Sequence, residues 1–224
     1  MNEKTNKLEK MSDFFAARVK DYDAHMLKNV DGAAFYYQEI AKIFPKRENL
    51  SVVDLGCGTG LELEEIFKVN ATVNITGLDL SDAMLRTLHE KYKDKCSQIN
   101  TVNIDYFHYN FGIERFDGAI SVQTLHHFPK VDKLALYRKI YNGIRKNGFY
   151  IEADYYAPDQ QYEEFYFSEN QRLRKENRVK EGEFYHYDTP CTISNQTQMF
   201  FKAGFQSVHL CYMHGNTGVF LLKK

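Results

Sequence analysis

The sequence predicts an α/β protein built on a mostly parallel, seven-stranded sheet that ends in an antiparallel hairpin. Short apolar runs of strand length alternate with helical patterns through the middle of the chain, which is typical of a parallel sheet covered by helices on both faces. The last two apolar runs, 205–212 and 218–222, are separated only by Met213 to Thr217, a connection too short for a crossover helix. These two runs are therefore expected to pair as a hairpin.

Two helices are expected before the first strand, because apolar residues recur there at helical spacing. We predict one helix over 12–26 and another over 33–44, and Pro45 with the polar residues after it ends the second. Arg18 and Tyr22 are four positions apart, hence on one face of the first helix, where they would suit a lid over a bound ligand. A solvated face for Arg18 and core packing for Tyr22 are the alternatives.

The alternation of strands and helices begins at Leu50 and continues to Ala153. The predicted strands are 50–55, 74–78, 99–104, 116–122 and 148–153, and the predicted helices are 61–68, 82–92 and 133–144.

The segment 155–199 is rich in aromatic and charged residues and has no evident place in the sheet, so it is the expected substrate cap. A single domain is expected for a chain of 224 residues. Its predicted parts are the N-terminal lid helices (1–48), a ligand-binding core (49–154), the small helical cap (155–199) and the C-terminal hairpin region (200–224).

The composition excludes several classes of protein. The 29 basic and 30 acidic side chains give a net charge of -1, so nucleic acid would need a local patch. No apolar run approaches the ~18 residues that span a bilayer, and the start lacks the apolar region of a secretory signal, so a cytoplasmic protein without membrane partners is expected. The 4 cysteines form no C-x-x-C pair, which favours reduced thiols, and no metal is expected.

The strongest local signal is the run Val52-Val53-Asp54-Leu55-Gly56-Cys57-Gly58-Thr59-Gly60, where a buried strand turns through alternate glycines into a helix. Glycine suits such a turn because it adopts positive φ angles and because a ligand can approach its backbone closely. A dinucleotide loop of the G-x-G-x-x-G type would have its third glycine at position 61, which is Leu here. On this loop alone, a general nucleotide loop or a tight turn stays open as an alternative.

The spacing D-x-G-x-G-x-G resembles the first motif of the class I S-adenosylmethionine-dependent methyltransferases, which have a three-layer, Rossmann-like α/β fold whose parallel sheet ends in a hairpin. The resemblance implies that the loop wraps the amino-acid end of S-adenosylmethionine (SAM) and that Asp54 helps to hold its ammonium group. Three further stations follow in the order of this family. The resemblance therefore covers 51–153 and extends to the terminal hairpin.

At the second station, Gly77-Leu78-Asp79-Leu80-Ser81, an acid just past a strand end would accept both ribose hydroxyls, although NAD would use such an acid as well. The third, Asn103-Ile104-Asp105-Tyr106, matches the adenine-reading position, with a loop carboxylate as the alternative. The fourth, 121–128, contains Leu125-His126-His127 and resembles the family's L-H-H motif. The implied cofactor-binding residues are Arg18, Tyr22, Asp54, Gly56, Cys57, Gly58, Gly60, Asp79, Leu80, Met84, Asp105, Tyr106 and Gln123, with core packing as the alternative for Met84.

Methyl transfer from a sulfonium needs few catalytic side chains, because the protein mainly positions the nucleophile. His126, His127 and His186 are the candidates for a general base near neutral pH, although in the resembling family the first two positions more often shape the cleft. The aromatic runs 165–167 and 184–187 would surround a substrate or form a small subcore.

We therefore predict SAM-dependent methyl transfer to an unidentified small-molecule acceptor, with the oligomeric state left open and a dimer compatible. The chain from Ala135 to its end also resembles carboxy-S-adenosylmethionine synthase, a tRNA-wobble-uridine pathway enzyme, so a tRNA-modification role is the second hypothesis. That family grips the cofactor's extra carboxylate with a cap arginine, and 185–192 contains none. A catalytically silent SAM-binding protein and an NAD-dependent oxidoreductase are the remaining alternatives.

Overall fold

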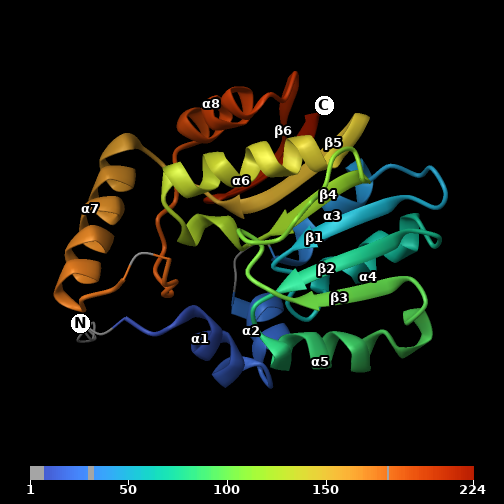
Figure 1. The fold of residues 1–224 in the computed structure, drawn as a ribbon, viewed down its shortest axis with the longest axis horizontal. Coiled ribbons are helices and arrows are strands. Elements are labelled where there is room, and N and C mark those ends of the chain that lie inside the picture. The colour runs from blue at the N-terminus through green and yellow to red at the C-terminus, as the bar shows by residue number, and fades with distance from the viewer. Residues whose placement is uncertain (1–7, 30–32, 181) are drawn as a thin grey trace.

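The computed structural model describes residues 8–29, 33–180 and 182–224. These residues fold around a seven-stranded sheet of order β3-β2-β1-β4-β5-β7-β6 (Figure 1). Strands β1 to β5 run parallel, whereas β7 pairs antiparallel with both β5 and β6, so the predicted mostly parallel sheet and its closing hairpin are confirmed. The strands are β1 (Ser51–Leu55), β2 (Asn74–Asp79), β3 (Ile99–Asn103), β4 (Phe116–Val122), β5 (Ile144–Tyr155), β6 (Ser207–His214) and β7 (Thr217–Lys223).

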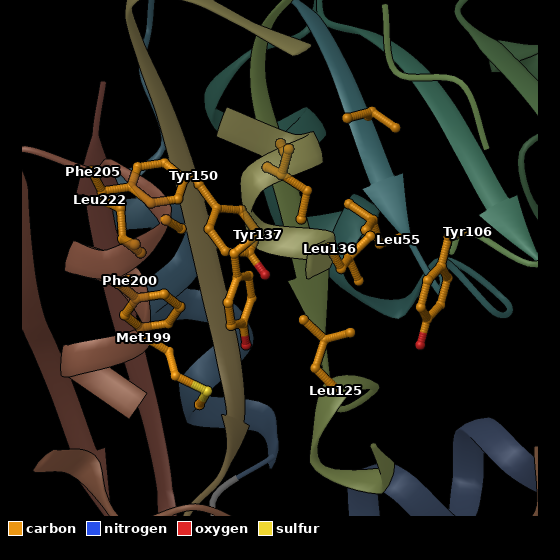
Figure 2. Packing of buried hydrophobic residues seen from close by; sticks show 14 of the residues in the cluster. Leu55, Tyr106, Leu125, Leu136, Tyr137, Tyr150, Met199, Phe200, Phe205 and Leu222 are labelled. Atoms are coloured by element: carbon orange, nitrogen blue, oxygen red, sulfur yellow. The ribbon is translucent and has the colours of Figure 1, made fainter. Parts of the chain in front are cut away.

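Helices cover both faces of the sheet and produce three layers (Figure 1). Val52 and Val53 are neighbours in β1 but belong to opposite buried clusters, because successive strand side chains point to opposite faces. The cluster around Val53 includes Tyr137 of α6 and Phe200 of α8 (Figure 2), and the one around Val52 includes residues of α3, α4 and α5. The helices are α1 (Met11–Arg18), α2 (Tyr22–Asn29), α3 (Ala33–Ile43), α4 (Leu61–Val69), α5 (Asp82–Lys91), α6 (Lys130–Gly143), α7 (Gln160–Glu176) and α8 (Ile193–Ala203), with short 3₁₀ turns η1 (Lys93–Lys95) and η2 (Leu125–His127).

The single helix predicted over 12–26 is wrong, because α1 ends at Arg18 and α2 begins at Tyr22. A turn separates them, closed by a hydrogen bond from the amide of Asp21 to the carbonyl of Arg18 at 3.2 Å. The amide of His25 donates to the carbonyl of Asp21 at 2.8 Å, so Asp21 immediately precedes α2, at a position that aspartate favours. Arg18 and Tyr22 therefore do not share the face of one helix.

Two boundaries in the second half of the sheet also differ from the prediction. α6 begins at Lys130, directly after Pro129, rather than at position 133. β5 begins at Ile144 rather than at Gly148, because its residues 145–147 are exposed and the apolar pattern reveals only the buried part of the strand. No helix within 8–29, 33–180 and 182–224 is long and apolar enough to cross a membrane.

The predicted cap segment 155–199 contains two structural parts. α7 stands apart from the sheet, at the left of Figure 1, whereas residues 193–199 begin α8, which packs beside α6. Glu163 of α7 is fully buried, and its carboxylate pairs with Lys130 and accepts the amide hydrogen of Thr192 at 2.5 Å. The cap helix is thus anchored to the beginning of α6 and of α8.

Candidate cofactor and acceptor site

The glycine loop lies between β1 and α4, at the edge of the sheet where the parallel strands end (Figure 1). Gly56 and Gly58 both have positive φ angles, 68° and 49°. A Cβ atom on Gly56 would lie 2.4 Å from Oγ1 of Thr124, whereas a Cβ on Gly58 would meet only the carbonyl oxygen of Gly56, at 4.0 Å. Gly56 is therefore required by packing, while the backbone at Gly58 borders open space that a ligand can occupy.

Cys57 and Gly60 shape the same loop from its buried side. The side chain of Cys57 is 3% exposed, and its Sγ atom lies so close to Gly77 that a Cβ there would be 2.8 Å away. The hydroxyl of Tyr92 donates to the carbonyl of Gly60 at 2.6 Å. These contacts hold the loop against β2 and the end of α5.

Asp54 and Glu62 place two buried carboxyl groups behind the loop. Asp54 is 1% exposed and Glu62 is 5% exposed. Both oxygens of Asp54 and Oε1 of Glu62 lack a hydrogen-bond partner among the described residues. Burial raises the pKa of Asp54 well above its ordinary value, and burial also raises the pKa of Glu62 to about 7. Unpaired buried carboxyl oxygens fit a cationic group of a ligand, which would remove the cost of leaving them unsatisfied.

Asp79 closes β2 and faces the glycine loop. Its Oδ2 atom accepts the amide hydrogen of Gly58 at 2.9 Å, and Oδ1 accepts that of Ser81 at 2.7 Å. Burial raises the pKa of Asp79, while these N–H donors act in the opposite direction. The carboxylate is thus held in one orientation at the edge where a ribose is expected.

A small cavity of about 40 Å³ borders Asp79, Gly56, Leu80 and Tyr106. Met11, Ser12 and Phe15 of α1 line it as well, so the first helix covers this part of the cleft. The hydroxyl of Tyr106 lies 3.0 Å from Oγ1 of Thr124. Four of the predicted cofactor-binding residues therefore meet around one space.

Asp105 and Met84 lie differently from these four residues. The carboxylate of Asp105 accepts the amide hydrogen of Phe107 at 2.8 Å and lies 2.5 Å from Nδ1 of His108, so it is engaged within its own loop. Met84 is 1% exposed and lines neither of the two main cavities of the described site. Their contacts with adenine stay predictions.

A larger cavity of about 650 Å³ adjoins the small one, and Phe15 lines both. It is lined by residues of α1 and α2, of the ends of β4, β5 and β7, and of the loop after α7, and it opens to solvent on one side. The predicted site residues in its lining are Arg18, Tyr22, Gln123, His126, His127 and His186. The structure thus brings the lid residues and the candidate bases together.

The lid residues reach this cavity from separate helices. The guanidinium of Arg18 lies 3.3 Å from Oε1 of Glu9 and 3.6 Å from the ring centre of Phe14. Burial raises the pKa of the Tyr22 hydroxyl well above its ordinary value. Arg18 therefore lies half exposed at the cavity wall with its guanidinium held by Glu9 and Phe14, whereas Tyr22 presents a neutral phenol.

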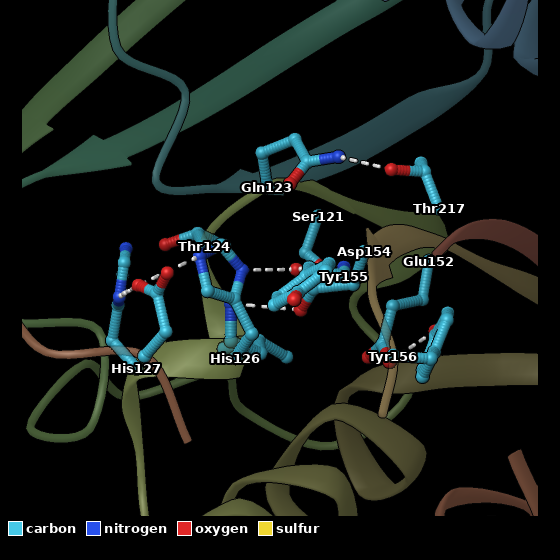
Figure 3. Close-up of polar contacts among 12 residues, drawn as sticks. Ser121, Gln123, Thr124, His126, His127, Glu152, Asp154, Tyr155, Tyr156 and Thr217 are labelled. Carbon is cyan, nitrogen blue, oxygen red and sulfur yellow. Dashed lines mark hydrogen bonds and ion pairs between the residues drawn. The ribbon is translucent and has the colours of Figure 1, made fainter. Parts of the chain in front are cut away.

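Gln123 enters the same lining from the end of β4. Its φ angle is 52°, and its side-chain amide donates to Oγ1 of Thr217 at 3.5 Å (Figure 3). The backbone amide of Gln123 donates to the carbonyl of Ala153 at 2.8 Å. These contacts tie the fourth motif to β5 and β7.

Three histidines gather on the cap side of the large cavity. His126 and His127 come from η2, and each is 8% exposed. Nδ1 of His126 lies 2.5 Å from Oδ1 of Asp154 (Figure 3), and the ring of His186 stacks on Phe14 with centroids 3.5 Å apart. Asp154, at the end of a buried strand, is a polar partner that the motifs do not reveal.

The neighbouring charges affect these histidines in different directions. Burial acts to lower the pKa of His126, but the Asp154 carboxylate raises it above its ordinary value. Burial and the nearby His126 lower the pKa of His127, and burial together with His127 lowers that of His186 to about 4.

The lid is fastened at both ends. The amide of Met11 donates to the carbonyl of Phe184 at 3.1 Å, and the amide of His186 donates to that of Glu9 at 2.9 Å. At the other end, the hydroxyl of Thr59 donates to Asp23 of α2 at 2.5 Å. The lid is therefore hydrogen-bonded both to the cap segment and to the glycine loop.

Comparison with known proteins agrees with this geometry. Residues 52–148 match the family described as a methyltransferase domain. The chain is 25% identical to a carboxy-S-adenosyl-L-methionine synthase from Campylobacter hominis, in an alignment covering 98% of this chain and 97% of the relative. It is also 30% identical to a sterol 24-C-methyltransferase from Neurospora crassa, over 46% of this chain and 27% of that protein. The similarity to the synthases therefore extends well before Ala135.

Solved structures share the fold at low sequence identity. DhpI in complex with SAM and HEP superposes with a TM-score of 0.68 and 16% identity, covering 95% of this chain and 94% of that one. Human N-acetylserotonin methyltransferase in complex with SAM gives a TM-score of 0.67 and 17% identity, covering 94% of this chain and 56% of that one. Residues 52–148 therefore match a methyltransferase domain, and the parallel sheet that closes in a hairpin has the same fold as these two SAM-containing structures.

Proposed function

We propose that the protein binds SAM at the glycine loop and transfers its methyl group to a small molecule held in the large cavity. One observation carries the proposal: the buried carboxyl oxygens of Asp54 accept no hydrogen bond from an N–H donor of the described residues, their neighbour is a second buried carboxyl, Glu62, and they lie next to a loop whose Gly58 borders open space. The ammonium group of SAM supplies the missing positive charge. Relatives of the same fold whose structures contain SAM support this choice of cofactor.

The remaining contacts follow from the positions of the side chains. Asp54 and Glu62 would hold the ammonium group, and Asp79 would accept the ribose hydroxyls with the lone pairs that its two N–H donors leave free. Leu80 and Tyr106 would line the adenosine portion. When bound, SAM supplies a methyl group on a positively charged sulfur, so the chain has only to orient an acceptor and exclude water.

The acceptor is expected to be a small molecule because of the size and position of the second cavity. Its volume of about 650 Å³ lies within the range of pockets that enclose small ligands. Phe14, Phe15 and Tyr155 supply apolar surface, while His126 and His186 supply polar atoms. Such a lining suits an acceptor with an aromatic or otherwise planar apolar part and an oxygen or nitrogen nucleophile.

Calorimetric titration of the purified protein with SAM, S-adenosylhomocysteine and NAD tests the proposal. We expect binding of the first two and none of NAD. Asp54→Asn keeps the size of the side chain but removes its charge. This variant should lose most of its affinity for SAM while its melting temperature stays close to that of the unchanged protein. Binding of NAD without SAM would contradict the proposed cofactor.

A second candidate function is the synthesis or use of carboxy-SAM, which is favoured by the similarity to a synthase over 98% of the chain. Residues 185–192 contain no arginine, but Arg18 of the lid lines the large cavity, and its guanidinium would exchange Glu9 for an added carboxylate. Tighter binding of carboxy-SAM than of SAM, lost in Arg18→Ala, would favour this candidate and the tRNA-modification role. If Arg18→Ala loses affinity for carboxy-SAM and for SAM by the same factor, Arg18 acts through the position of the lid and not through the added carboxylate.

A further inference from the structure

His126, His127 and Asp188 bring three potential metal ligands together in the acceptor cavity. Nε2 of His126 lies 3.6 Å from Oδ1 of Asp188, and Nδ1 of His127 lies 3.1 Å from the same oxygen. All three atoms lie within 4.8 Å of one another. Both histidines are buried, while the Asp188 side chain is 41% exposed and faces the cavity.

These separations suit a small divalent cation. Nitrogen and oxygen ligands bind zinc at about 2.0 to 2.2 Å, which puts two ligands of a tetrahedral site about 3.3 Å apart. The distances of 3.1 and 3.6 Å from Asp188 to the two imidazoles lie on either side of that value.

A further observation points to a ligand here. Nδ1 of His127 is buried and faces Oδ1 of Asp188 at 3.1 Å, the same oxygen that faces Nε2 of His126. Oδ1 of Asp154 lies 2.5 Å from Nδ1 of His126, and Oδ2 of Asp154 accepts the amide hydrogen of Leu125 at 3.0 Å. A carboxylate that holds one imidazole nitrogen and leaves the other free is the usual support of a metal-ligating histidine.

We propose that His126, His127 and Asp188 form a binding site for a divalent first-row transition metal of the zinc type, in the wall of the acceptor cavity. Two imidazoles and one carboxylate suit such a metal, whereas magnesium and calcium prefer oxygen ligands alone. Three protein ligands leave coordination positions open, as in catalytic rather than structural zinc sites. These positions face the cavity, where an oxygen of the acceptor can complete the coordination.

The site deepens the proposed methyl transfer and rests on it for the identity of the cavity as the acceptor pocket. A metal at this site would favour acceptors that carry an oxygen ligand, such as a hydroxyl or a carboxylate. In this arrangement His126 and His127 would serve as ligands rather than as bases, and a bound metal would supply the charge that lowers the pKa of a coordinated hydroxyl.

The test uses the full-length, tag-free protein, stripped of metal by a chelator and titrated with zinc chloride and, separately, with cobalt chloride. We expect one equivalent of either ion, with a visible absorption band for cobalt bound by nitrogen and oxygen. His127→Ala and Asp188→Ala should weaken binding by about 100-fold or more, and Asp154→Asn by about 10- to 100-fold. His209→Ala, an exposed histidine on β6, is the matched control and should bind like the unchanged protein.

Circular dichroism of each variant separates loss of metal from loss of fold. If Asp188→Ala is unfolded, Asp188→Ser replaces it, because serine removes the carboxylate ligand but keeps a polar side chain at this position. Zinc binding that is equally weak in the unchanged protein and in folded Asp188→Ala would overturn the metal site. SAM is titrated into the same metal-free protein. SAM binding without a metal site refutes only this inference. A metal site without SAM binding refutes the proposed function and the acceptor assignment, but leaves the metal site itself standing.

Discussion

The backbone N–H of Gly58 donates a hydrogen bond to Oδ2 of Asp79 at 2.9 Å, and this contact joins the glycine loop to the end of the neighbouring strand. Asp79→Ala should weaken SAM binding by roughly 3 kcal/mol, or about 100-fold in Kd, because two hydrogen bonds to a charged group are worth about 1.5 kcal/mol each at the low end. Calorimetric titration measures the change. Asp94→Ala, in an exposed turn, is the control, and unchanged affinity in Asp79→Ala would refute the ribose assignment.

Gly58 and Gly56 allow a paired test of the loop. Gly58→Val places its side chain in open space, so it should abolish measurable SAM binding while the positive φ angle costs about 1 to 2 kcal/mol of stability. Gly56→Ala should instead destabilise the fold more strongly, because its Cβ would collide with Thr124. Thermal melting and SAM titration of both variants distinguish the two effects. Retained SAM affinity in Gly58→Val would contradict a cofactor loop.

The Asp54 and Glu62 pair predicts that SAM affinity depends on pH. Burial raises both pKa values, so the free protein holds protons here that must leave before the carboxylates can pair with an ammonium group. The affinity for SAM should therefore increase as the pH rises from 6 to 8. Titrations across this range check the direction, and Glu62→Gln should flatten the dependence. A constant affinity in the unchanged protein would show that this pair does not contact the cation.

The same pair predicts the opposite trend for stability in the absence of SAM. The pKa of Glu62 is higher in the folded than in the unfolded chain, so between its ordinary value and about 7 the folded state binds more protons. The free energy of unfolding should fall as the pH rises through this window. Denaturant titrations between pH 5 and 8 measure the slope, which should become shallower in Glu62→Gln. A slope that is the same in both proteins would assign the trend to other groups.

Glu152 predicts a stability effect that leaves the cofactor site untouched. Its buried carboxylate accepts hydrogen bonds from Tyr137 at 2.9 Å, Tyr150 at 2.7 Å, Tyr156 at 3.0 Å (Figure 3) and Gln196 at 3.0 Å. Glu152→Ala leaves all four donors without this acceptor and should destabilise the protein by about 3 kcal/mol or more. Denaturant unfolding measures the loss. Glu152→Gln keeps one acceptor oxygen, so its free energy of unfolding should fall less than that of Glu152→Ala. Equal decreases in the two variants would show that these hydrogen bonds do not stabilise the fold.

The order of strands and helices could be predicted from the sequence because it depends on local signals. The loop from Asp54 to Gly60 and the acid Asp79 each stand at the end of an apolar run that is recognisable as a strand. The connection after Tyr212 is so short that the last two strands must form a hairpin. A parallel sheet then brings these strand ends to one edge whatever the details of packing. This is why the residues around Gly56 and Asp79 were predictable as neighbours.

The contacts of the lid and cap were decided by the tertiary structure. The apolar residues Phe15, Val19 and Tyr22 keep helical spacing across the turn, so the break between α1 and α2 leaves no clear mark in the pattern. Asp188 lies far along the chain from His127, in a segment without regular structure, and their contact depends on how the loop after α7 folds back. The periodicity of a sequence reports which face of an element is buried, whereas pairing of polar side chains across distant loops depends on packing that brings them together.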